Sequence, residues 1–501
     1  MAESRTDLEA AVVRHRAGDL DGAAAVYRAV LARDPNNADA AHLSGVIALQ
    51  KGDAVAAWDL IQHARELRPR SADIAYNLGR VAAALQDWPA AVEANRAALA
   101  LSPQMSAAAC NLGIALVHSG DAVAGEAAIR TALAADSNTA ANWSALGLAL
   151  HDQAKDTDAR AAWEKARTLD PELAEAAFNL ACSYLRCGDL VRGWPLFAAR
   201  AAADPASFAN GGAMPAHVPR WNGETLSGRR VLIWGEQGLG DQILYAGFIP
   251  MLGTRDVVLA CAPRLVPLLT RAFPDVTVLP QDSQLATRLA DLKCDVVIPL
   301  ADLGHVAWPT AASPRAKYLR ADPARVAMLR QRYQGWSKGG PLIGVSWHSH
   351  RATGGARKSL PLAQWQPIAS TPGATLISVQ YGDTEADLAA GATAGVAVHR
   401  DPEIDATHDM EGLAAQLAAV DLVISVSNTT VHLAGGLGLP VWTLAPLGGG
   451  SLWYWFDQPS GQTSPWYPHL RVFHQDRPGA WGPAVERVRV ALENFHPPVR
   501  D

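Results

Sequence analysis

Two patterns of apolar and polar positions divide this chain of 501 residues. Over residues 1–205, apolar segments of helical length repeat every 34 residues, whereas from residue 229 short apolar runs alternate with longer mixed segments. Residues 206–228 follow neither pattern and contain many Gly, Pro and polar residues, which is typical of a linker or an ordered strap. The sequence therefore predicts a helical repeat region, a connecting segment and an α/β region.

The 34-residue period is visible in helix-breaking and small residues. Helix breakers occur at Pro35, Pro69, Pro103, Ser137, Pro171 and Pro205, and small residues keep the same spacing at Gly45, Gly79, Gly113, Gly147 and Ala181. This pattern resembles the tetratricopeptide repeat, in which two antiparallel helices meet at a Gly or Ala. A single helical hairpin cannot bury its apolar face, so the repeats must stack. We expect about six repeats, the first partial, in a right-handed α solenoid over residues 1–205.

Three asparagines, Asn77, Asn111 and Asn179, occupy the same position in their repeats. In peptide-binding members of this repeat family, asparagines at this position form a ladder along the concave groove. An amide both donates and accepts hydrogen bonds, so it can pair with an extended backbone of any sequence. These residues are therefore candidates for holding a protein partner. Local hydrogen bonding within each repeat is the alternative.

Seven apolar runs after residue 229 predict β-strands. They are "RRVLIWG", "DVVLACA", "DVVIPL", "PLIGVSW", "ATLISVQ", "DLVISV" and "PVWTLA". Short, nearly continuous apolar runs separated by helix-length segments are typical of parallel sheets that are covered on both faces. The sequence predicts two Rossmann-like halves, residues 229–335 and 336–501, the second closed by a helix within "PAVERVRVALENF".

A glycine-rich turn, "GEQGLGD" at residues 235–241, follows the first of these runs. Its glycines are ordered G-x-x-G-x-G rather than G-x-G-x-x-G, and the lysine of a Walker loop is missing, which argues against dinucleotide binding and ATP hydrolysis. The turn instead places Asp241 after the first strand, at the edge where open α/β sheets bind their ligands. Asp241 is a candidate catalytic base, and a helix cap is the alternative.

A second turn contains several hydroxyl and amide side chains. Asn428, Thr429 and Thr430 follow the run "DLVISV" and start a predicted helix, and His432 comes one turn later. The free N–H groups and the dipole of a helix start attract anions, so this segment is a candidate phosphate site. Simple N-capping is the alternative, although a cap needs only one such residue.

A polar loop within residues 344–362 carries His348, His350, Arg357 and Lys358. Because it is glycine-rich and cationic, we expect it to close over a diphosphate, with Lys358 as the favoured contact. Solvated loop charge is the alternative for each residue.

Several further side chains are candidates for contacts with a donor. Gln380, which ends the run "LISVQ", is in a position to contact a nucleobase. Trp453, Trp455, Trp466 and Tyr467 can stack on a sugar or a base, and packing beneath a loop is the alternative.

Composition narrows the class of function. The formal net charge of −6 argues against a nucleic-acid partner, because neutralising phosphates needs clustered Lys and Arg. The five cysteines lack zinc-ligand spacing, which indicates reduced thiols. We find no signal peptide at the start and no apolar run of the roughly 18 residues that a membrane span needs. These features together lead us to expect a cytoplasmic protein. No Asp-x-Asp sequence occurs after residue 229, so we expect no metal, and we expect no cofactor.

Three stretches support a more specific interpretation. "GEQGLGDQI", "SNTTVHLAGGLGLPVW" and "SPWYP", which begin at residues 235, 427 and 464, resemble the catalytic part of bacterial tetratricopeptide-linked glycosyltransferases. Those enzymes are relatives of the heptosyltransferases of glycosyltransferase family 9. The resemblance implies a GT-B fold and an inverting transfer from a nucleotide-sugar donor.

The resemblance also assigns roles to residues. Gly240 and Asp241 match the turn that faces the acceptor. Residues 428–430, with His432, match the helix start that holds the donor phosphates. Lys358 matches a phosphate-binding lysine. Related sequences often carry Asp-Thr where this chain has Ser427 followed by Asn428. This departure weakens the case for ADP-heptose and leaves CMP-, UDP-, GDP- and ADP-linked sugars open.

The predicted acceptor is a Ser or Thr of a protein held by the repeats. Flagellin-modifying glycosyltransferases of some alphaproteobacteria share this layout, so flagellin is a candidate acceptor and a nonulosonic acid a candidate sugar. Two alternatives remain. One is a non-catalytic scaffold with a degenerate transferase half, and the other is a heptosyltransferase-like enzyme that acts on a glycan.

Overall fold

The structure is a computed structural model that describes residues 2–208, 212–307, 317–350, 354–457 and 462–497. Two predicted segments extend beyond these residues, the connecting segment at 209–211 and the polar loop at 351–353. Contacts divide the chain into two compact units, Met1–Ala176 and Ala177–Asp501. The division falls within the last predicted repeat, upstream of residue 205.

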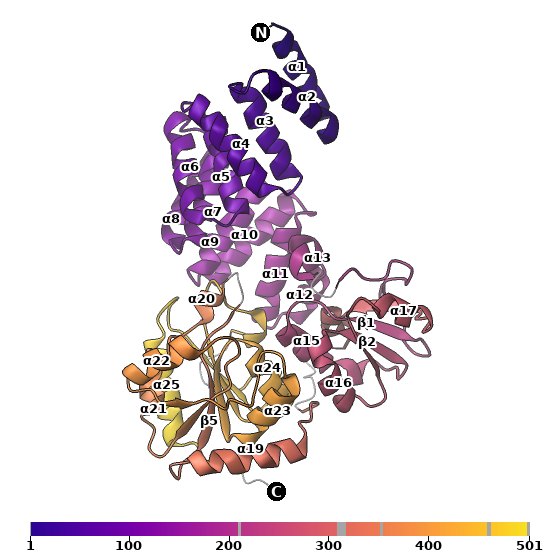
Figure 1. The fold of residues 1–501 in the computed structure, drawn as a ribbon, viewed down its shortest axis with the longest axis vertical. Coiled ribbons are helices and arrows are strands. Elements are labelled where there is room, and N and C mark those ends of the chain that lie inside the picture. The colour runs from indigo at the N-terminus through magenta and orange to yellow at the C-terminus, as the bar shows by residue number, and fades with distance from the viewer. Residues whose placement is uncertain (1, 209–211, 308–316, 351–353, 458–461, 498–501) are drawn as a thin grey trace. The chain divides into compact units, whose positions relative to one another are not determined.

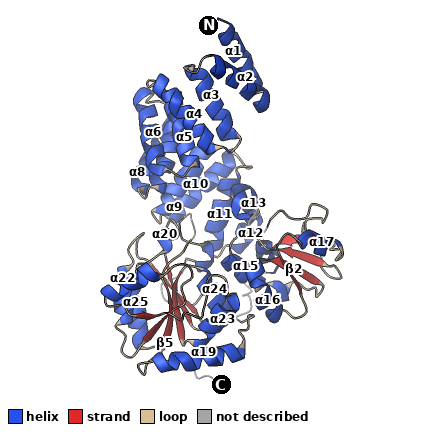
Figure 2. Ribbon diagram, in the orientation of Figure 1, coloured by secondary structure: helices blue, strands red, loops and turns tan. Residues whose placement is uncertain are grey.

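The first unit is built of successive helical pairs (Figures 1 and 2). Its helices are α1 (Ala2–Arg16), α2 (Leu20–Arg33), α3 (Ala38–Gln50), α4 (Ala54–Leu67), α5 (Ala72–Ala84), α6 (Trp88–Leu101), α7 (Ser106–His118), α8 (Ala122–Ala135), α9 (Ala140–Asp152) and α10 (Asp156–Leu169). The two helices of each repeat pack against each other, and α7 and α8 are one such pair. The prediction of stacked helical hairpins is confirmed.

Small residues allow the two helices of a repeat to approach closely. A Cβ atom added at Gly147 would lie 2.3 Å from the indole nitrogen of Trp163, so no larger residue fits there. The turns show a second regularity, because Gly120 has φ 95° and Ala154, one repeat later, takes the same left-handed conformation with φ 60°. A side chain disfavours this conformation, so the stacking of the helices overrides the local preference of Ala154.

The second unit contains two parallel sheets, shown in red in Figure 2. The four-stranded sheet is formed by β1 (Val231–Trp234), β2 (Val257–Cys261), β3 (Thr277–Pro280) and β4 (Val296–Pro299). Its strand order is β3-β2-β1-β4. In register, Val231 pairs with Val257 on one side and with Val296 on the other. The strand order therefore reverses between β1 and β4, and the turn after β1 emerges beside this point.

The six-stranded sheet has the order β10-β9-β8-β5-β6-β7. Its strands are β5 (Leu342–Ser346), β6 (Thr375–Ser378), β7 (Val398–His399), β8 (Leu422–Val426), β9 (Val441–Ala445) and β10 (Leu470–His474). The first strand, β5, lies between β6 and β8, which is the doubly wound arrangement of α/β proteins. All seven predicted strands are confirmed, and β3, β7 and β10 are additional strands that the sequence pattern did not predict.

Helices cover both sheets. They are α11 (Ala174–Arg186), α12 (Leu190–Phe197), α13 (Arg200–Ala203), α14 (Pro205–Phe208), α15 (Leu239–Ala246), α16 (Val266–Ala272), α17 (Leu285–Ala290), α18 (Leu303–Ala307), α19 (Pro323–Trp336), α20 (Gly355–Lys358), α21 (Gln366–Ala369), α22 (Glu385–Thr393), α23 (Met410–Ala419), α24 (Thr429–Gly436) and α25 (Gly482–Glu493). The last of these is the predicted closing helix.

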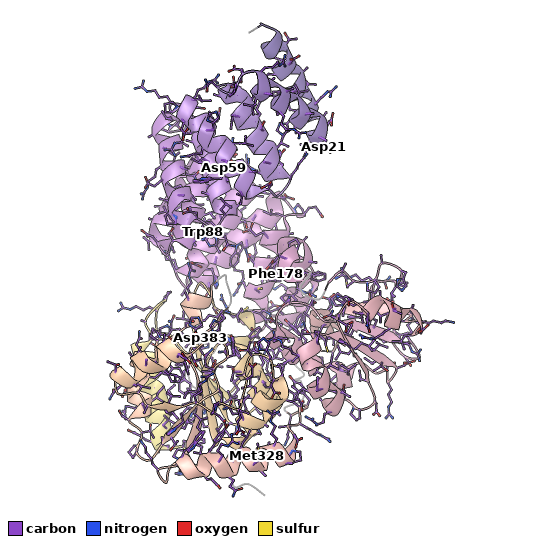
Figure 3. All side chains as sticks on the ribbon, in the orientation of Figure 1. Asp21, Asp59, Trp88, Phe178, Met328 and Asp383 are labelled. Atoms are coloured by element: carbon purple, nitrogen blue, oxygen red, sulfur yellow. The ribbon has the colours of Figure 1, made fainter. Side chains whose placement is uncertain are left out.

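Helix α12 packs within the second unit, which explains why the division precedes residue 205. The Trp194 ring meets Trp453 edge-on, with the ring centroids 5.3 Å apart. Phe197 contacts both Trp453 and Phe178, and Figure 3 labels the latter on α11. A Cβ atom at Gly304 would collide with Trp194 at 2.1 Å, so the indole lies directly on the backbone of α18. The last helical pair is therefore part of the α/β unit's core.

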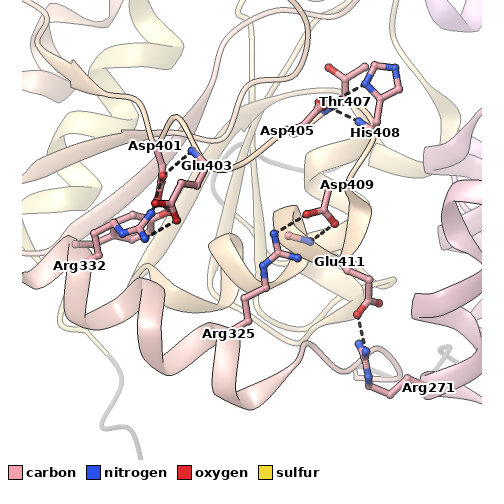
Figure 4. Close-up of polar contacts among 12 residues, drawn as sticks. Arg271, Arg325, Arg332, Asp401, Glu403, Asp405, Thr407, His408, Asp409 and Glu411 are labelled. Carbon is pink, nitrogen blue, oxygen red and sulfur yellow. Dashed lines mark hydrogen bonds and ion pairs between the residues drawn. The ribbon is translucent and has the colours of Figure 1, made fainter.

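The two sheets are joined by buried and charged contacts. Tyr318, in the segment that connects them, donates from its hydroxyl to the carbonyl of Ile243 at 2.6 Å and from its backbone N–H to Gly436 at 3.0 Å. Arg271 of α16 forms an ion pair with Glu411 of α23 (Figure 4). These contacts hold α15 against α24, which pack together.

Ion pairs also fix α19 beneath the six-stranded sheet's loops. Arg325 pairs with Asp409, and Arg332 pairs with Asp401 and Glu403 (Figure 4). The loop 401–409 that precedes α23 is therefore anchored along one helix.

Candidate functional site

The turn after β1 presents Asp241 at the start of α15. Gly238 is the N-cap of this helix, and its backbone N–H donates to the Asp241 carboxylate at 3.2 Å. The carboxylate thus closes the first turn of the helix, as the capping alternative predicts. Asp241 is half-buried. Capping and proton abstraction are compatible at this position.

The turn after β8 is capped by Asn428. Its side-chain oxygen accepts from the N–H of Thr430 at 3.0 Å and from the hydroxyl of Ser425 at 3.0 Å. Its side-chain nitrogen donates to the Ser346 hydroxyl at 2.8 Å and to the His348 carbonyl at 3.1 Å. The amide of Asn428 therefore joins the ends of β5 and β8, where the strand order reverses.

The two threonines that follow Asn428 differ in exposure. Thr429 is half-buried, whereas Thr430 is fully buried and its hydroxyl has no hydrogen-bond partner among the described residues. A buried hydroxyl without a partner is unusual and indicates a place where a polar ligand atom would be stabilised. The first turn of α24 therefore contains a hydroxyl, that of Thr430, that is not used by the cap.

His432 is buried in an aromatic cluster. Its ring stacks on Trp455 with centroids 5.2 Å apart and meets Tyr454 edge-on, and Nδ1 lies 3.4 Å from the Tyr467 hydroxyl. Burial, reinforced by the charge of Lys358, lowers the pKa of His432 to about 3. The imidazole is therefore neutral near pH 7.

The four aromatic side chains considered for stacking on a sugar or base, Trp453, Trp455, Trp466 and Tyr467, are all buried. The indole of Trp455 donates to the hydroxyl of Ser427 at 2.7 Å. These rings pack in the core, as the alternative predicts.

Lys358 ends the short helix α20 and is only 4% exposed. The positive charge of Lys358 contributes to the lowered pKa of His432. A Cβ atom at Gly450 would lie 3.3 Å from Cβ of Arg357 and 3.6 Å from Cγ of Lys358. The loop after β9, with its run of three glycines at 448–450, therefore packs directly against α20. The glycine run is the feature of the sequence that indicates such close packing, and it is not among the site residues predicted from the sequence.

Gln380 differs from its predicted role. Its side-chain oxygen accepts from the hydroxyl of Ser346 and from the backbone N–H groups of Trp347 and His348, each at 2.9 Å. Its nitrogen donates to the carbonyls of His348 and Tyr381. Because both amide hydrogens are used within the protein, Gln380 braces the loop after β5 and its amide is not available to a nucleobase.

The two histidines of the polar loop contact each other. The rings of His348 and His350 lie 4.4 Å apart, and Nε2 of His350 lies 3.1 Å from the Tyr381 carbonyl oxygen. Partial burial, followed by the proximity of His350, lowers the pKa of His348. His350 packs on Gly382, where a Cβ atom would lie 2.5 Å from Nε2.

The Asp241 turn and the start of α24 meet. A Cβ atom added at Gly240 would lie 3.0 Å from Cδ2 of His432 and 3.4 Å from Cα of Thr429. A side chain at position 240 would require these neighbours to shift by a few tenths of an ångström. The structure thus brings Gly240, Asp241, Thr429 and His432 together, with Lys358 beside them.

Two cavities lie elsewhere in the second unit. One of about 770 Å³ is lined by Trp442, Arg471, Phe473 and residues of α25, and one of about 200 Å³ by Phe273 and Tyr318. Across the described ranges we find no group of three or more His, Cys, Asp or Glu side chains that could hold a metal ion. Within the same ranges, no helix is both long enough and apolar enough to cross a membrane.

The three repeat asparagines are not in one unit. Asn77 and Asn111 lie in the first unit and Asn179 in the second, and all three are half-buried. The amide of Asn77 bonds to His42 at 2.8 Å and accepts from Arg80 at 3.1 Å. Of these two contacts, the one to His42 reaches the preceding repeat and the one to Arg80 lies within the same helix.

Comparison with known proteins identifies the repeats. The sequence profile of the tetratricopeptide repeat matches residues 8–69 and 59–106. The chain contains tetratricopeptide repeats. Protein FlbA of Caulobacter vibrioides is 33% identical over 350 residues, which cover 65% of this chain and 56% of FlbA. The chain thus spans just over half the length of this curated relative.

Solved structures that match part of this chain include two TPR proteins and PilF. YrrB, described as a TPR protein with an unusual peptide-binding site, is 20% identical with a TM-score of 0.30, covering 34% of this chain and 88% of YrrB. A thermophilic TPR protein of Thermus thermophilus is 19% identical with a TM-score of 0.32, covering 36% of this chain and 99% of its own. PilF of Pseudomonas aeruginosa is 16% identical with a TM-score of 0.35, covering 41% and 93%.

Proposed function

We propose that residues 229–501 form an inverting, metal-independent glycosyltransferase of the GT-B type, which moves a sugar from a nucleotide donor to Ser or Thr of a protein held by the repeats. The observation that carries this proposal is the close approach of the Asp241 turn to the start of α24, where a Cβ atom added at Gly240 would lie 3.0 Å from His432 and 3.4 Å from Thr429. Both turns follow strands at which the strand order of their sheet reverses. Open α/β sheets bind ligands at this place.

The donor's phosphate would lie at the start of α24. The positive end of the helix dipole, the unpartnered Thr430 hydroxyl and the nearby Lys358 ammonium would all stabilise negative charge there. Thr429 is half-buried and can reach a ligand. Asn428 acts by shaping the turn, because its own polar atoms are used within the protein. His348, His350 and Arg357 are the loop residues nearest to such a donor in the proposal.

The proposed chemistry is one displacement. The acceptor hydroxyl oxygen forms a bond to the anomeric carbon while the bond from that carbon to the nucleotide's phosphate oxygen breaks. The hydroxyl proton moves to the Asp241 carboxylate, and the leaving phosphate keeps the electron pair. General-base assistance of this kind contributes about 10²–10⁴-fold to a rate. Fixed positive groups at the leaving phosphate add to it, because they need no reorganisation during the reaction.

The repeats would select the acceptor. Tetratricopeptide repeats form extended surfaces that suit a protein segment better than a lipid-linked sugar. Flagellin is the proposed acceptor and a nonulosonic acid the proposed sugar, on the resemblance given above. A heptosyltransferase-like transfer to a glycan would use the same site with a different acceptor.

The direct test is Asp241→Asn in the full chain. The variant should lose at least about a hundredfold in transfer rate, since it cannot take the proton. Its affinity for the nucleotide should stay unchanged, because the donor contacts α24. The amide oxygen can still accept from Gly238, so loss of fold is not expected. Transfer at the wild-type rate would remove Asp241 from the base role.

One observation favours a second candidate, a non-catalytic scaffold. The polar groups of Asn428 and Gln380, and the hydroxyl of Ser427, are occupied by contacts within the chain. A scaffold would have no nucleotide site to keep open. Thermal shift with CMP-, UDP-, GDP- and ADP-sugars separates the two candidates, since stabilisation by one of them supports the transferase and stabilisation by none supports the scaffold.

A further inference from the structure

Three charged side chains form a buried cluster beneath the Asp241 turn. Arg200, the first residue of α13, is 2% exposed, and Glu236 is 1% exposed. The guanidinium of Arg200 makes a two-pronged ion pair with Glu236 and a further contact to Asp302 at 2.6 Å. Its Nη1 also donates to the Phe197 carbonyl at 3.0 Å. A single arginine thus serves two carboxylates and one carbonyl.

The cluster is closed by further contacts. Glu236 accepts from the backbone N–H of Ala301 at 3.1 Å. The rings of Phe197 and Phe208 lie 4.9 and 5.6 Å from the guanidinium carbon. Burial by itself would lower the pKa of Arg200, but Asp302 and Glu236 outweigh it and raise the pKa, so Arg200 stays charged. An ion cluster this deep is stable only when every member keeps its partners.

The cluster lies between the ends of β1 and β4. Glu236 lies two residues after β1, and Asp302 lies shortly after β4. These strands are neighbours, and the strand order of the sheet reverses between them. Arg200, which comes from outside the sheet, therefore enters the crevice at its carboxyl edge. The same segment is seated by Trp194 on Gly304.

We propose that Arg200 is a positioning residue that holds the turn 235–241 and thereby sets the location of the Asp241 carboxylate relative to α24. This proposal rests on the proposed function for its catalytic consequence. The turn is held at Glu236 by Arg200 and by the N–H of Ala301, and at Gly238 by Asp241 itself. A change at Arg200 removes the charged contact to Glu236 and leaves the contacts from Ala301 and Asp241.

The chemistry requires arginine at this position. A planar guanidinium presents five donors in a fixed fork, which matches two carboxylates and a carbonyl at once. Lysine carries the same charge on a compact ammonium and cannot reproduce the two-pronged contact to Glu236. Arg200→Lys therefore keeps the charge and removes the geometry.

The test compares Arg200→Lys with Arg220→Lys in the full chain. Arg220 pairs with the same Asp302 at 3.2 Å, but its side chain is 45% exposed, so it is a matched control at the rim. With a working donor and acceptor, Arg200→Lys should lower kcat at least tenfold and leave KM for the donor within twofold. Arg220→Lys should change neither. A wild-type kcat in folded Arg200→Lys overturns the proposal.

Hydrogen exchange gives a second readout that needs no activity. In Arg200→Lys, amides of residues 234–246 should exchange at least tenfold faster, while those of 424–437 keep their rate. If the wild-type protein transfers no sugar, the proposed function fails, yet this exchange pattern still decides whether Arg200 positions the turn. Unchanged exchange at 234–246 overturns the positioning role. If Arg200→Lys does not fold, Glu236→Gln, which keeps the shape and weakens the pair, is measured in the same way with the same outcomes.

Discussion

The turns of the two sheets are braced by opposite means. Beneath the Asp241 turn the bracing groups are charged. Glu236 and Asp302 lie in the sheet's own loops, and Arg200 comes from a helix outside the sheet. At the ends of β5 and β8 the bracing groups are the neutral amides of Gln380 and Asn428, which lie in the sheet's own loops. Two similar sheets thus use different chemistry for the same task.

The difference teaches how each turn depends on the rest of the fold. A buried ion cluster stabilises one arrangement strongly, but it leaves a costly unpaired charge when one member is removed. An amide network has smaller consequences, since each lost partner leaves one neutral group unsatisfied. The Asp241 turn therefore depends on a side chain of the helical segment, whereas the turns after β5 and β8 are braced from within the loops of their own sheet.

The largest effect is expected from Glu236→Ala. It leaves Arg200 buried with Asp302 as its remaining carboxylate, and the free energy of unfolding should fall by about 3 kcal/mol or more. Urea unfolding followed by tryptophan fluorescence measures this. The control is Glu486→Ala, which removes an exposed pair with Arg489 and should have little effect on the unfolding free energy. Equal losses of unfolding free energy in the two variants would show that the buried ion cluster is no more important for stability than an exposed pair.

A smaller effect is expected from Gln380→Leu. The change leaves the N–H groups of Trp347 and His348 without their acceptor, which should cost about 1–3 kcal/mol in unfolding free energy. Gln366→Leu, at an exposed amide, is the matched control and should have little effect. If Gln380→Leu is as stable as the wild-type protein, the Gln380 amide does not stabilise the loop after β5.

The smallest effect concerns pH. The folded pKa of His432 is about 3, below its ordinary value of 6.5. Between these values the unfolded chain binds a proton that the folded chain does not, so stability is full above pH 6.5 and falls as the pH drops. This residue alone should lower the unfolding free energy by about 1 kcal/mol from pH 7 to pH 5.5.

The pH prediction is checked by urea unfolding of His432→Gln at both pH values. The variant should lose this part of the pH dependence, and the same substitution at the exposed His469 should not. An unchanged pH dependence in His432→Gln would show that His432 does not cause the loss of stability at low pH.

The strands that the sequence pattern missed share one property. β3, β7 and β10 are edge strands, and β3 is only partly buried. These three strands lack the continuous apolar run that burial on both faces requires, so their sequences resemble those of loops. The central strands and the buried edge strand β4 carry such runs and were predicted correctly.

The candidate site shows the same limit. The capping alternatives for Asp241 and Asn428 involve neighbours within three residues, so they could be stated from the sequence. The use of Gln380 by groups more than thirty residues away could not. Nothing local distinguishes an amide that waits for a ligand from one that braces a loop.

By itself the sequence determined the 34-residue period, the central strands and the glycine-rich turn with its acid, because each is a property of neighbouring residues. Only the tertiary structure decided that Arg200 joins Glu236, 36 residues further along, and that Gly240 touches the start of α24. Contacts between distant segments depend on how whole sheets and helices pack. That packing minimises the exposed apolar surface of all segments together, and no single stretch encodes it.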